Sequence, residues 1–142
     1  MDELVTRHDL SLDAARRLVG LVVDPARAEG VALTVAVVDA AGTLIAFERM
    51  DGAPRFSAQL AVAKARTAAT FGNATSQLES SFRERAVFAN SFASQGDWYF
   101  GRGGFPVTVA GEIVGGIGVS GETADREEDL ARRAAAAAER PR

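Results

Sequence analysis

Lys64 is the residue whose type and position point most directly to chemistry. It is the one lysine among the 16 lysines and arginines of the chain. Residues 57–72 predict a helix, and at about 100° per residue Lys64 shares one face with Leu60 and Thr67. Because that face is otherwise apolar or hydroxyl-bearing, we expect Lys64 to point inward, toward a pocket or subunit contact that arginine would not fit. The alternative is an apolar stem on this stripe with the ammonium reaching water.

Two further residues could take part in chemistry with Lys64. A lysine whose pKa is lowered by burial serves as a base or forms a Schiff base, and Asp51 could hold or relay a proton beside it. Arg49 precedes the turn at Asp51 and Gly52, and its guanidinium suits a carboxylate ligand. The structural alternative is an ion pair of Arg49 with Asp51 or Glu48 at a strand end.

Three adjacent aromatic residues form a second candidate site. Trp98, Tyr99 and Phe100 stand beside a glycine-rich stretch, residues 101–104. Their rings could line an apolar slot for a ligand. The alternative is a short strand whose three rings pack into the core.

Residues 116–121 read Gly-Ile-Gly-Val-Ser-Gly, the G-x-G-x-x-G pattern of dinucleotide-binding proteins. Only 21 residues follow this pattern, which leaves no room for the next strand and its ribose-binding acid. We therefore interpret these glycines as positions where a helix or a neighbouring subunit lies close to a strand.

His8 is the single histidine, and the chain has no cysteine. A Ser-His-Asp triad would have to use His8, and no G-x-S-x-G motif accompanies it. One imidazole and no thiolate also fail to make a metal cage, so we expect no metal site. His8 stays a candidate axial ligand to haem, with a solvent-facing histidine near the chain end as the alternative.

Length and composition indicate a single domain, residues 1–142. The absence of cysteine and of a signal-peptide pattern in the first thirty residues predicts a cytoplasmic protein. The net charge of −3 gives no electrostatic footprint for nucleic acid, and no apolar run approaches the ~20 residues that cross a bilayer. We expect neither a nucleic-acid nor a membrane partner.

Apolar periodicity predicts the elements that must position these residues. The predicted helices begin near Ser11, Ser57, Ser76 and either Ser120 or Thr123. The third of them reads as one helical stretch to about Asn90. Strand patterns cover residues 31–39 and 43–50 and then flank a turn at 110–112, so the strands read as two hairpins. This order predicts a mainly antiparallel sheet with helices on both faces.

Five short motifs occur in order along the chain: Asp39-x-x-Gly42-x-Leu44, Arg49-Met50-Asp51-Gly52-Ala53, Lys64-Ala65-x-Thr67-Ala68, Gly103-Gly104-x-Pro106 and Gly115-x-x-Gly118-Val119-Ser120-Gly121. Each motif alone is weak, whereas all five in this order make a specific match. Over about residues 11–137 the chain resembles the GlcG/HbpS-like family of small haem-binding or haem-degrading proteins. That family also supplies the C-terminal domain of some cobalamin-related proteins.

The resemblance implies an α/β (α+β) fold, a profilin-like three-layer α/β/α domain whose mainly antiparallel sheet we expect to have five strands. It also implies a bacterial homo-oligomer in which the Arg49 turn and the Lys64 helix lie near subunit contacts and a cleft. Together with the aromatic segment, it points to ligand-binding residues Arg49, Lys64, Thr67, Trp98, Tyr99, Gly103, Gly104 and Ser120. The first helix carries no histidine, although some haem-binding relatives have their axial ligand there.

Two functions remain open at this point. The first is an oligomeric small-molecule-binding protein that holds haem, a related tetrapyrrole or another flat or acidic ligand in a cleft lined by Arg, Lys and aromatic residues. Haem is then the candidate cofactor. The second is a cofactor-independent enzyme of a catabolic or secondary-metabolite pathway, with Lys64 and Asp51 as its acid–base residues.

Overall fold

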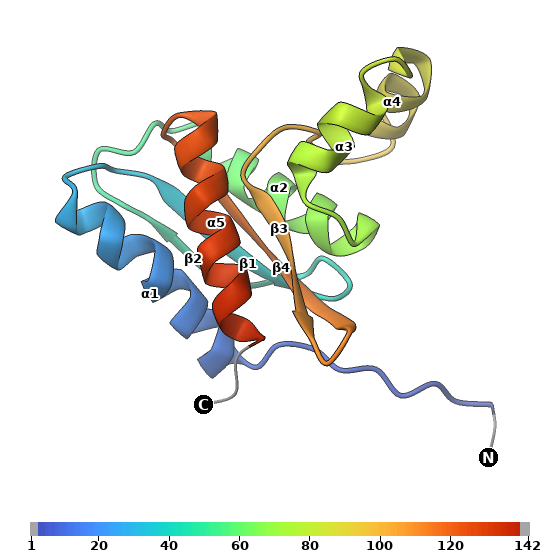
Figure 1. The fold of residues 1–142 in the computed structure, drawn as a ribbon, viewed down its shortest axis with the longest axis horizontal. Coiled ribbons are helices and arrows are strands. Elements are labelled where there is room, and N and C mark those ends of the chain that lie inside the picture. Colours follow the sequence, from blue (N-terminus) through green and yellow to red (C-terminus); the bar gives the residue numbers. More distant parts are fainter. Residues whose placement is uncertain (1–2, 140–142) are drawn as a thin grey trace.

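The structure is a computed structural model and describes residues 3–139. Five helices and four strands follow one another along this part of the chain: α1 (Leu12–Ala28), β1 (Thr34–Asp39), β2 (Leu44–Arg49), α2 (Ser57–Phe71), α3 (Thr75–Phe82), α4 (Ala86–Ala93), β3 (Gly104–Val109), β4 (Glu112–Ser120) and α5 (Ala124–Ala138). Figure 1 shows how these elements are arranged. The two predicted hairpins, β1–β2 and β3–β4, are both present.

The sheet has four antiparallel strands in the order β2-β1-β4-β3, with Val35 opposite Glu48 on one side and Val119 on the other. Our expectation of five strands was wrong. The aromatic segment 98–100 is not a strand within the described residues. The backbone N–H of Tyr99, in the middle of this segment, donates to the Thr67 hydroxyl. It therefore forms no hydrogen bond to a neighbouring strand.

Helices cover both faces of the sheet (Figure 1). On one face, α1 and α5 pack with β1, β3 and β4 into the larger core, which includes Leu18, Val37, Val107, Ile117 and Leu130. On the other face, α2 packs its small residues on Ala36 and Val38 of β1. The mixed α/β architecture with an antiparallel sheet agrees with the sequence prediction.

Glycines in β4 let α2 approach the sheet closely. A Cβ on Gly118 would overlap the carbonyl oxygen of Ala61, and one on Gly116 would overlap that of Ala65. These residues belong to the G-x-G-x-x-G pattern, so part of that pattern serves helix-on-strand packing.

Helix capping follows the sequence in two of three places. The hydroxyls of Ser11 and Thr123 accept backbone N–H bonds at the starts of α1 and α5. The capping box predicted at Ser76 is not formed, because α3 already begins at Thr75. The expected helical stretch to Asn90 is also interrupted, and Arg85, with φ −126°, separates α3 from α4.

The α3–α4 pair projects from the body of the domain (Figure 1). Aromatic rings in edge or tilted contact join it to the end of α2 and to the loop before β3. We call these the ring cluster: Phe71, Phe82, Phe88, Phe92, Trp98 and Phe100. None of these six rings is buried.

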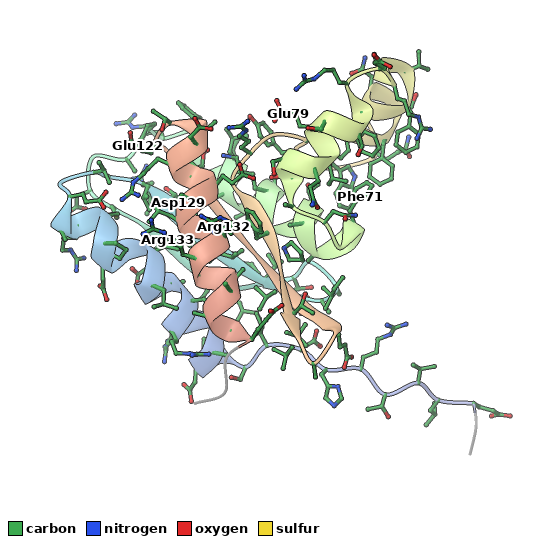
Figure 2. The ribbon with its side chains drawn as sticks, in the orientation of Figure 1. Phe71, Glu79, Glu122, Asp129, Arg132 and Arg133 are labelled. Atoms are coloured by element: carbon green, nitrogen blue, oxygen red, sulfur yellow. The ribbon has the colours of Figure 1, made fainter. Side chains whose placement is uncertain are left out.

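The outer face of α5 is charged. Figure 2 labels Asp129, Arg132 and Arg133 on this helix, and the Asp129 carboxylate pairs with both arginines. Such i, i+3 and i, i+4 pairs support an exposed helix. Within residues 3–139 no helix combines the length and the apolar character that crossing a membrane requires.

Candidate functional site

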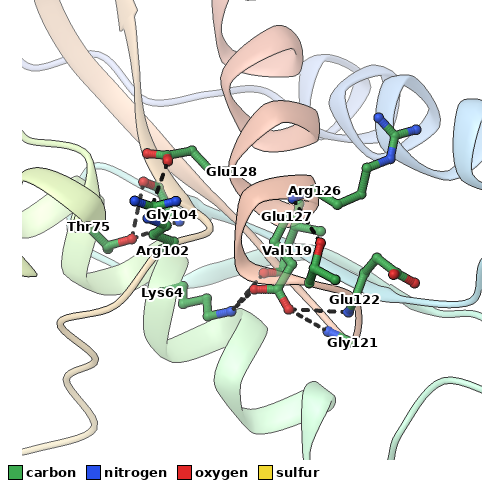
Figure 3. Close-up of polar contacts among 11 residues, drawn as sticks. Lys64, Thr75, Arg102, Gly104, Val119, Gly121, Glu122, Arg126, Glu127 and Glu128 are labelled. Carbon is green, nitrogen blue, oxygen red and sulfur yellow. Dashed lines mark hydrogen bonds and ion pairs between the residues drawn. The ribbon is translucent and has the colours of Figure 1, made fainter.

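Lys64 points inward, as predicted, and is only 2% exposed. Its Nζ lies 2.7 Å from Oε2 of Glu127 in α5 and donates a second hydrogen bond, of 3.0 Å, to the carbonyl oxygen of Val119 in β4. Glu127 is also buried. Lys64 therefore forms a buried ion pair that joins α2 to β4 and α5 (Figure 3).

The second oxygen of Glu127 orders the turn between β4 and α5. Oε1 accepts the backbone N–H groups of Gly121 at 3.0 Å and Glu122 at 3.2 Å. Both carboxylate oxygens are thus bonded, which offsets the cost of removing this charge from water. Glu127 is an acid in the first turn of α5, and nothing in the sequence around it marks it as the partner of Lys64.

Burial lowers the pKa of Lys64 from its ordinary value of 10.5, although the hydrogen bond and charge of Glu127 act in the opposite direction. The desolvation of the ammonium is the larger effect. The Nζ–Oε2 distance of 2.7 Å is within the range of charge-assisted hydrogen bonds.

Gly103 and Gly104 pack closely against Lys64. Gly103 has a φ of +113°, and a Cβ there would lie 2.6 Å from the Val119 carbonyl oxygen and 3.1 Å from Lys64 Nζ. The N–H of Gly104 donates to the Thr75 hydroxyl at 2.9 Å. These glycines leave room for the ion pair, and the conformation of Gly103 is one that favours glycine.

Tyr99 and Thr67 lie next to each other and close to Lys64. Thr67 Oγ1 accepts the Tyr99 backbone N–H at 3.0 Å and donates to the Ala63 carbonyl at 2.7 Å. The Tyr99 ring centroid lies 5.3 Å from Lys64 Nζ, within cation–π range. The structure therefore brings Lys64, Thr67, Tyr99 and Gly103 together, and Ser120 is buried at the end of β4 opposite Thr34.

A pocket of about 500 Å³ opens between the outer face of α2 and the loop before β3. We call it the α2 pocket. Its lining residues are Gln59, Leu60, Val62, Ala63, Arg66, Gly96, Asp97, Trp98 and Tyr99. Aromatic and aliphatic walls with one guanidinium suit a flat molecule that carries an acidic group. On a helical wheel Gln59 and Arg66 lie on a different face of α2 from Lys64, and both residues line this pocket.

Two polar groups of the α2 pocket are incompletely used by the protein. The indole N–H of Trp98 is buried and has no hydrogen-bond partner within the described residues. The Arg66 guanidinium reaches the Gly42 carbonyl at 3.3 Å and Asp97 at 3.7 Å, and the Asp97 side chain is 90% exposed. A ligand acceptor could therefore be bound without breaking a strong internal contact.

A larger pocket, of about 660 Å³, lies between α3 and the start of α5. Its walls are mainly polar, and the Arg102 guanidinium within it already pairs with Asp125 and Glu128. None of the residues predicted to bind a ligand lines it. We therefore place the candidate site in the α2 pocket.

Arg49 and Asp51 lie elsewhere, in a pocket of about 350 Å³ that they line with Val23, Arg27, Glu48 and Met50. Lys64 does not line this pocket. Within residues 3–139 no ion pair joins Arg49 to Glu48 or to Asp51. The structure does not bring the predicted acid–base pair, Lys64 and Asp51, together.

His8 lines none of these three pockets. Its Nδ1 is 2.8 Å from Oε2 of Glu112 at the start of β4, and its side chain is 70% exposed. The hydrogen bond from His8 lowers the pKa of Glu112. In the part of the chain that the structure describes, no cluster of three or more His, Asp or Glu side chains could hold a metal ion.

Comparisons with known proteins agree with the resemblance read from the motifs. Residues 10–136 match the family model described as haem degrading protein HbpS-like. Protein GlcG of Escherichia coli strain K12 is 33% identical over 118 residues, which are 81% of this chain and 84% of GlcG.

Two solved structures of similar proteins superpose on this chain over most of its length. A double mutant of Streptomyces reticuli HbpS superposes with a TM-score of 0.85 at 36% identity, over 96% of this chain and 92% of that one. A complex of PduOC with haem superposes with a TM-score of 0.82 at 32% identity, over 91% and 94% of the two chains.

Proposed function

Since this chain belongs to the HbpS-like family, we propose that it binds haem, a related tetrapyrrole or another flat molecule with acidic groups in the α2 pocket. Relatives with a haem-degrading description and with a solved haem complex support this class of ligand. The pocket's size is within the usual range of roughly 300–1,000 Å³ for small-molecule sites.

The observation that carries the proposal is the environment of Trp98. Its ring forms one wall of the α2 pocket, and its buried indole N–H has no partner within the described residues. A buried unpaired donor costs about 1–3 kcal/mol, which an acceptor on a ligand would recover. Arg66, in the same pocket, suits a carboxylate such as a porphyrin propionate.

The surroundings of Lys64 favour binding over acid–base catalysis. An effective general base needs access to its substrate, whereas Lys64 is 2% exposed and is already bonded to Glu127 and Val119. Asp51 lines a different pocket. We therefore assign Lys64 a structural role, in which it packs against the Tyr99 ring, rather than a role in proton transfer.

Ligand binding can be followed through a single fluorophore, because Trp98 is the only tryptophan of the chain. Titration with hemin and with metal-free protoporphyrin IX is expected to quench its emission with a saturable, one-to-one curve. Leu60→Arg, which places a bulky charge in the α2 pocket, is expected to weaken binding at least tenfold, about 1.4 kcal/mol.

Leu21→Arg is the matched control, since Leu21 is a 40% exposed leucine on α1 that lines neither the α2 pocket nor the Arg49 pocket. The control is expected to bind as the wild type does. Absence of quenching by both porphyrins in the wild type, or equal loss in both variants, would reject the α2 pocket as the site.

We also propose that the protein assembles with copies of itself. The support is the apolar surface of the projecting α4, where Val87 is 82% exposed and Phe88 is 37% exposed. Exposed apolar patches of this kind mark interaction surfaces. Nearby charges of both signs, Arg83, Glu84 and Arg85, could pair across a two-fold axis.

A further inference from the structure

Resting on the proposed function, we propose that Tyr99 supplies the protein ligand to the iron when a ferric porphyrin occupies the α2 pocket. The phenol would lose its proton to solvent, an oxygen lone pair would bind Fe(III), and the water or hydroxide that the iron carries in solution would leave. No electron is transferred in this step, so no oxidant or reductant is needed.

Tyr99 is identified by considering which side chains of this protein can ligate haem iron. The protein side chains that commonly ligate haem iron are those of His, Cys, Met and Tyr. This chain has one histidine, two methionines, one tyrosine and no cysteine. Of these, Met1 lies outside the described residues, Met50 lines the Arg49 pocket and His8 is hydrogen-bonded to Glu112 at the start of β4. Tyr99 is the one that lines the α2 pocket.

The backbone and neighbours of Tyr99 hold its side chain in a defined position. The N–H bond to Thr67 fixes the main chain against α2. Gly101 leaves space for the ring, since a Cβ there would overlap Cε1 and lie 3.1 Å from the hydroxyl oxygen. The residue is nevertheless 36% exposed, so its side chain remains accessible.

Lys64 helps to fix the position of the Tyr99 ring. Its Nζ lies 5.3 Å from the ring centroid and is held there by its bonds to Glu127 and Val119. A cation at this distance attracts the face of an aromatic ring. Because Tyr99 also lines the α2 pocket, its ring contacts both the buried ion pair and the space that a porphyrin would occupy.

The test compares the intact wild-type chain with Tyr99→Phe, using ferric hemin and metal-free protoporphyrin IX as probes. We expect wild-type hemin complexes to show a phenolate-to-iron charge-transfer band in absorption and phenolate modes in resonance Raman spectra. Tyr99→Phe is expected to lose both signatures and to bind hemin roughly tenfold or more weakly. Its affinity for protoporphyrin IX is expected to stay within about twofold, because that ligand has no iron.

His8→Ala is the control, and it is expected to keep the wild-type hemin spectrum. If Tyr99→Phe binds hemin with unchanged affinity and spectrum, or if His8→Ala abolishes the complex, the assignment of Tyr99 is overturned while the proposed pocket stands. If the wild type binds neither porphyrin, the proposed function fails and the assignment fails with it. A thermal melt of each variant confirms that the comparison concerns folded protein.

Discussion

Lys64 and Glu127 form one unit with the backbone around them. The pair joins three elements, α2, β4 and α5, and Glu127 additionally holds the two N–H groups that begin the turn into α5. A buried ion pair of this kind adds little net stability compared with apolar residues, whereas the loss of one partner is costly. The two charges should therefore behave as coupled in mutagenesis.

Lys64→Met is expected to destabilise the protein by about 3–5 kcal/mol, because it leaves the Glu127 carboxylate buried without its cation. Glu127→Gln keeps a carbonyl oxygen for Gly121 and Glu122 but leaves Lys64 unpaired, so it should also destabilise. Chemical denaturation measures each change.

The double variant Lys64→Met/Glu127→Gln is expected to be clearly more stable than the sum of the two single changes predicts. Strict additivity would show that the two side chains are not coupled and would contradict the ion pair as the reason for burying Lys64.

The pH dependence of Lys64 can be isolated because the chain has a single lysine side chain. Burial lowers the pKa of folded Lys64 below 10.5. Between that lowered pKa and 10.5 the unfolded chain binds more protons at this site, so the Lys64 contribution to the free energy of unfolding rises with pH.

Labelling with ¹⁵N-lysine gives one Nζ signal, whose titration is expected to have its midpoint below that of a free lysine. The difference in unfolding free energy between the wild type and Lys64→Met should grow over the same alkaline window. A midpoint at or above 10.5 would mean that the Glu127 charge outweighs burial.

At the scale of single residues, the sequence predicted that Lys64 points inward but did not predict its partner, Glu127. Helical periodicity placed Lys64 on the inner face of its helix, because periodicity within one element is a local property. Glu127 lies 63 residues away in the sequence, and its contact with Lys64 depends on how α5 packs beside α2 and β4. Only the packed structure shows that this carboxylate faces Lys64.

At the scale of elements, the close approach of α2 to β4 depends on glycines that have no room for a side chain. Gly118→Ala would place a Cβ against the backbone oxygen of Ala61, so α2 would have to move away from the sheet. We expect a loss of about 3 kcal/mol in unfolding free energy, at the upper end of typical overpacking.

Gly20→Ala is the matched control within α1, since the nearest atom to the added Cβ would be the Asp24 carboxylate at 3.8 Å. Replacing a glycine inside a helix by alanine should stabilise by about 0.5–1 kcal/mol. Thermal melts of the two variants should therefore shift in opposite directions, and a Gly118→Ala protein as stable as the wild type would contradict the packing role.

The elements were predictable where one local pattern dominated. Runs of β-branched and apolar residues joined by tight turns predicted both hairpins. Ser11 caps the first helix as predicted, and Thr123 is the one of the two candidate residues that caps the last helix. The region around Ser76 was mispredicted because Thr75 hydrogen-bonds across to Gly104, which lets the helix begin one residue before the expected cap. The segment 98–100 lacked a fifth strand for a similar reason, since Tyr99 bonds to a side chain of α2.

For the whole molecule, the main feature is the uneven distribution of apolar surface. The core packs around the sheet, whereas the ring cluster lies at the base of a projecting arm and contains no buried ring. Figure 2 labels Phe71, which contacts four other rings of this cluster. Within α4, six of the eight residues are Ala, Val or Phe, and none is buried. A helix of this composition is normally covered by another surface.

We expect this surface to be covered by a second copy of the chain. Light scattering at micromolar concentration should give a mass that is a multiple of 14.9 kDa. Val87→Glu places a charge on the most exposed large apolar side chain of α4 and should shift the mass toward the monomer, because burying an unpaired carboxylate at an interface is costly. Leu21→Glu on α1 is the matched control and should leave the assembly intact. A wild type that already has the mass of one chain would contradict self-assembly, and an assembly that survives Val87→Glu but not Leu21→Glu would place the contact on α1 instead of on the arm.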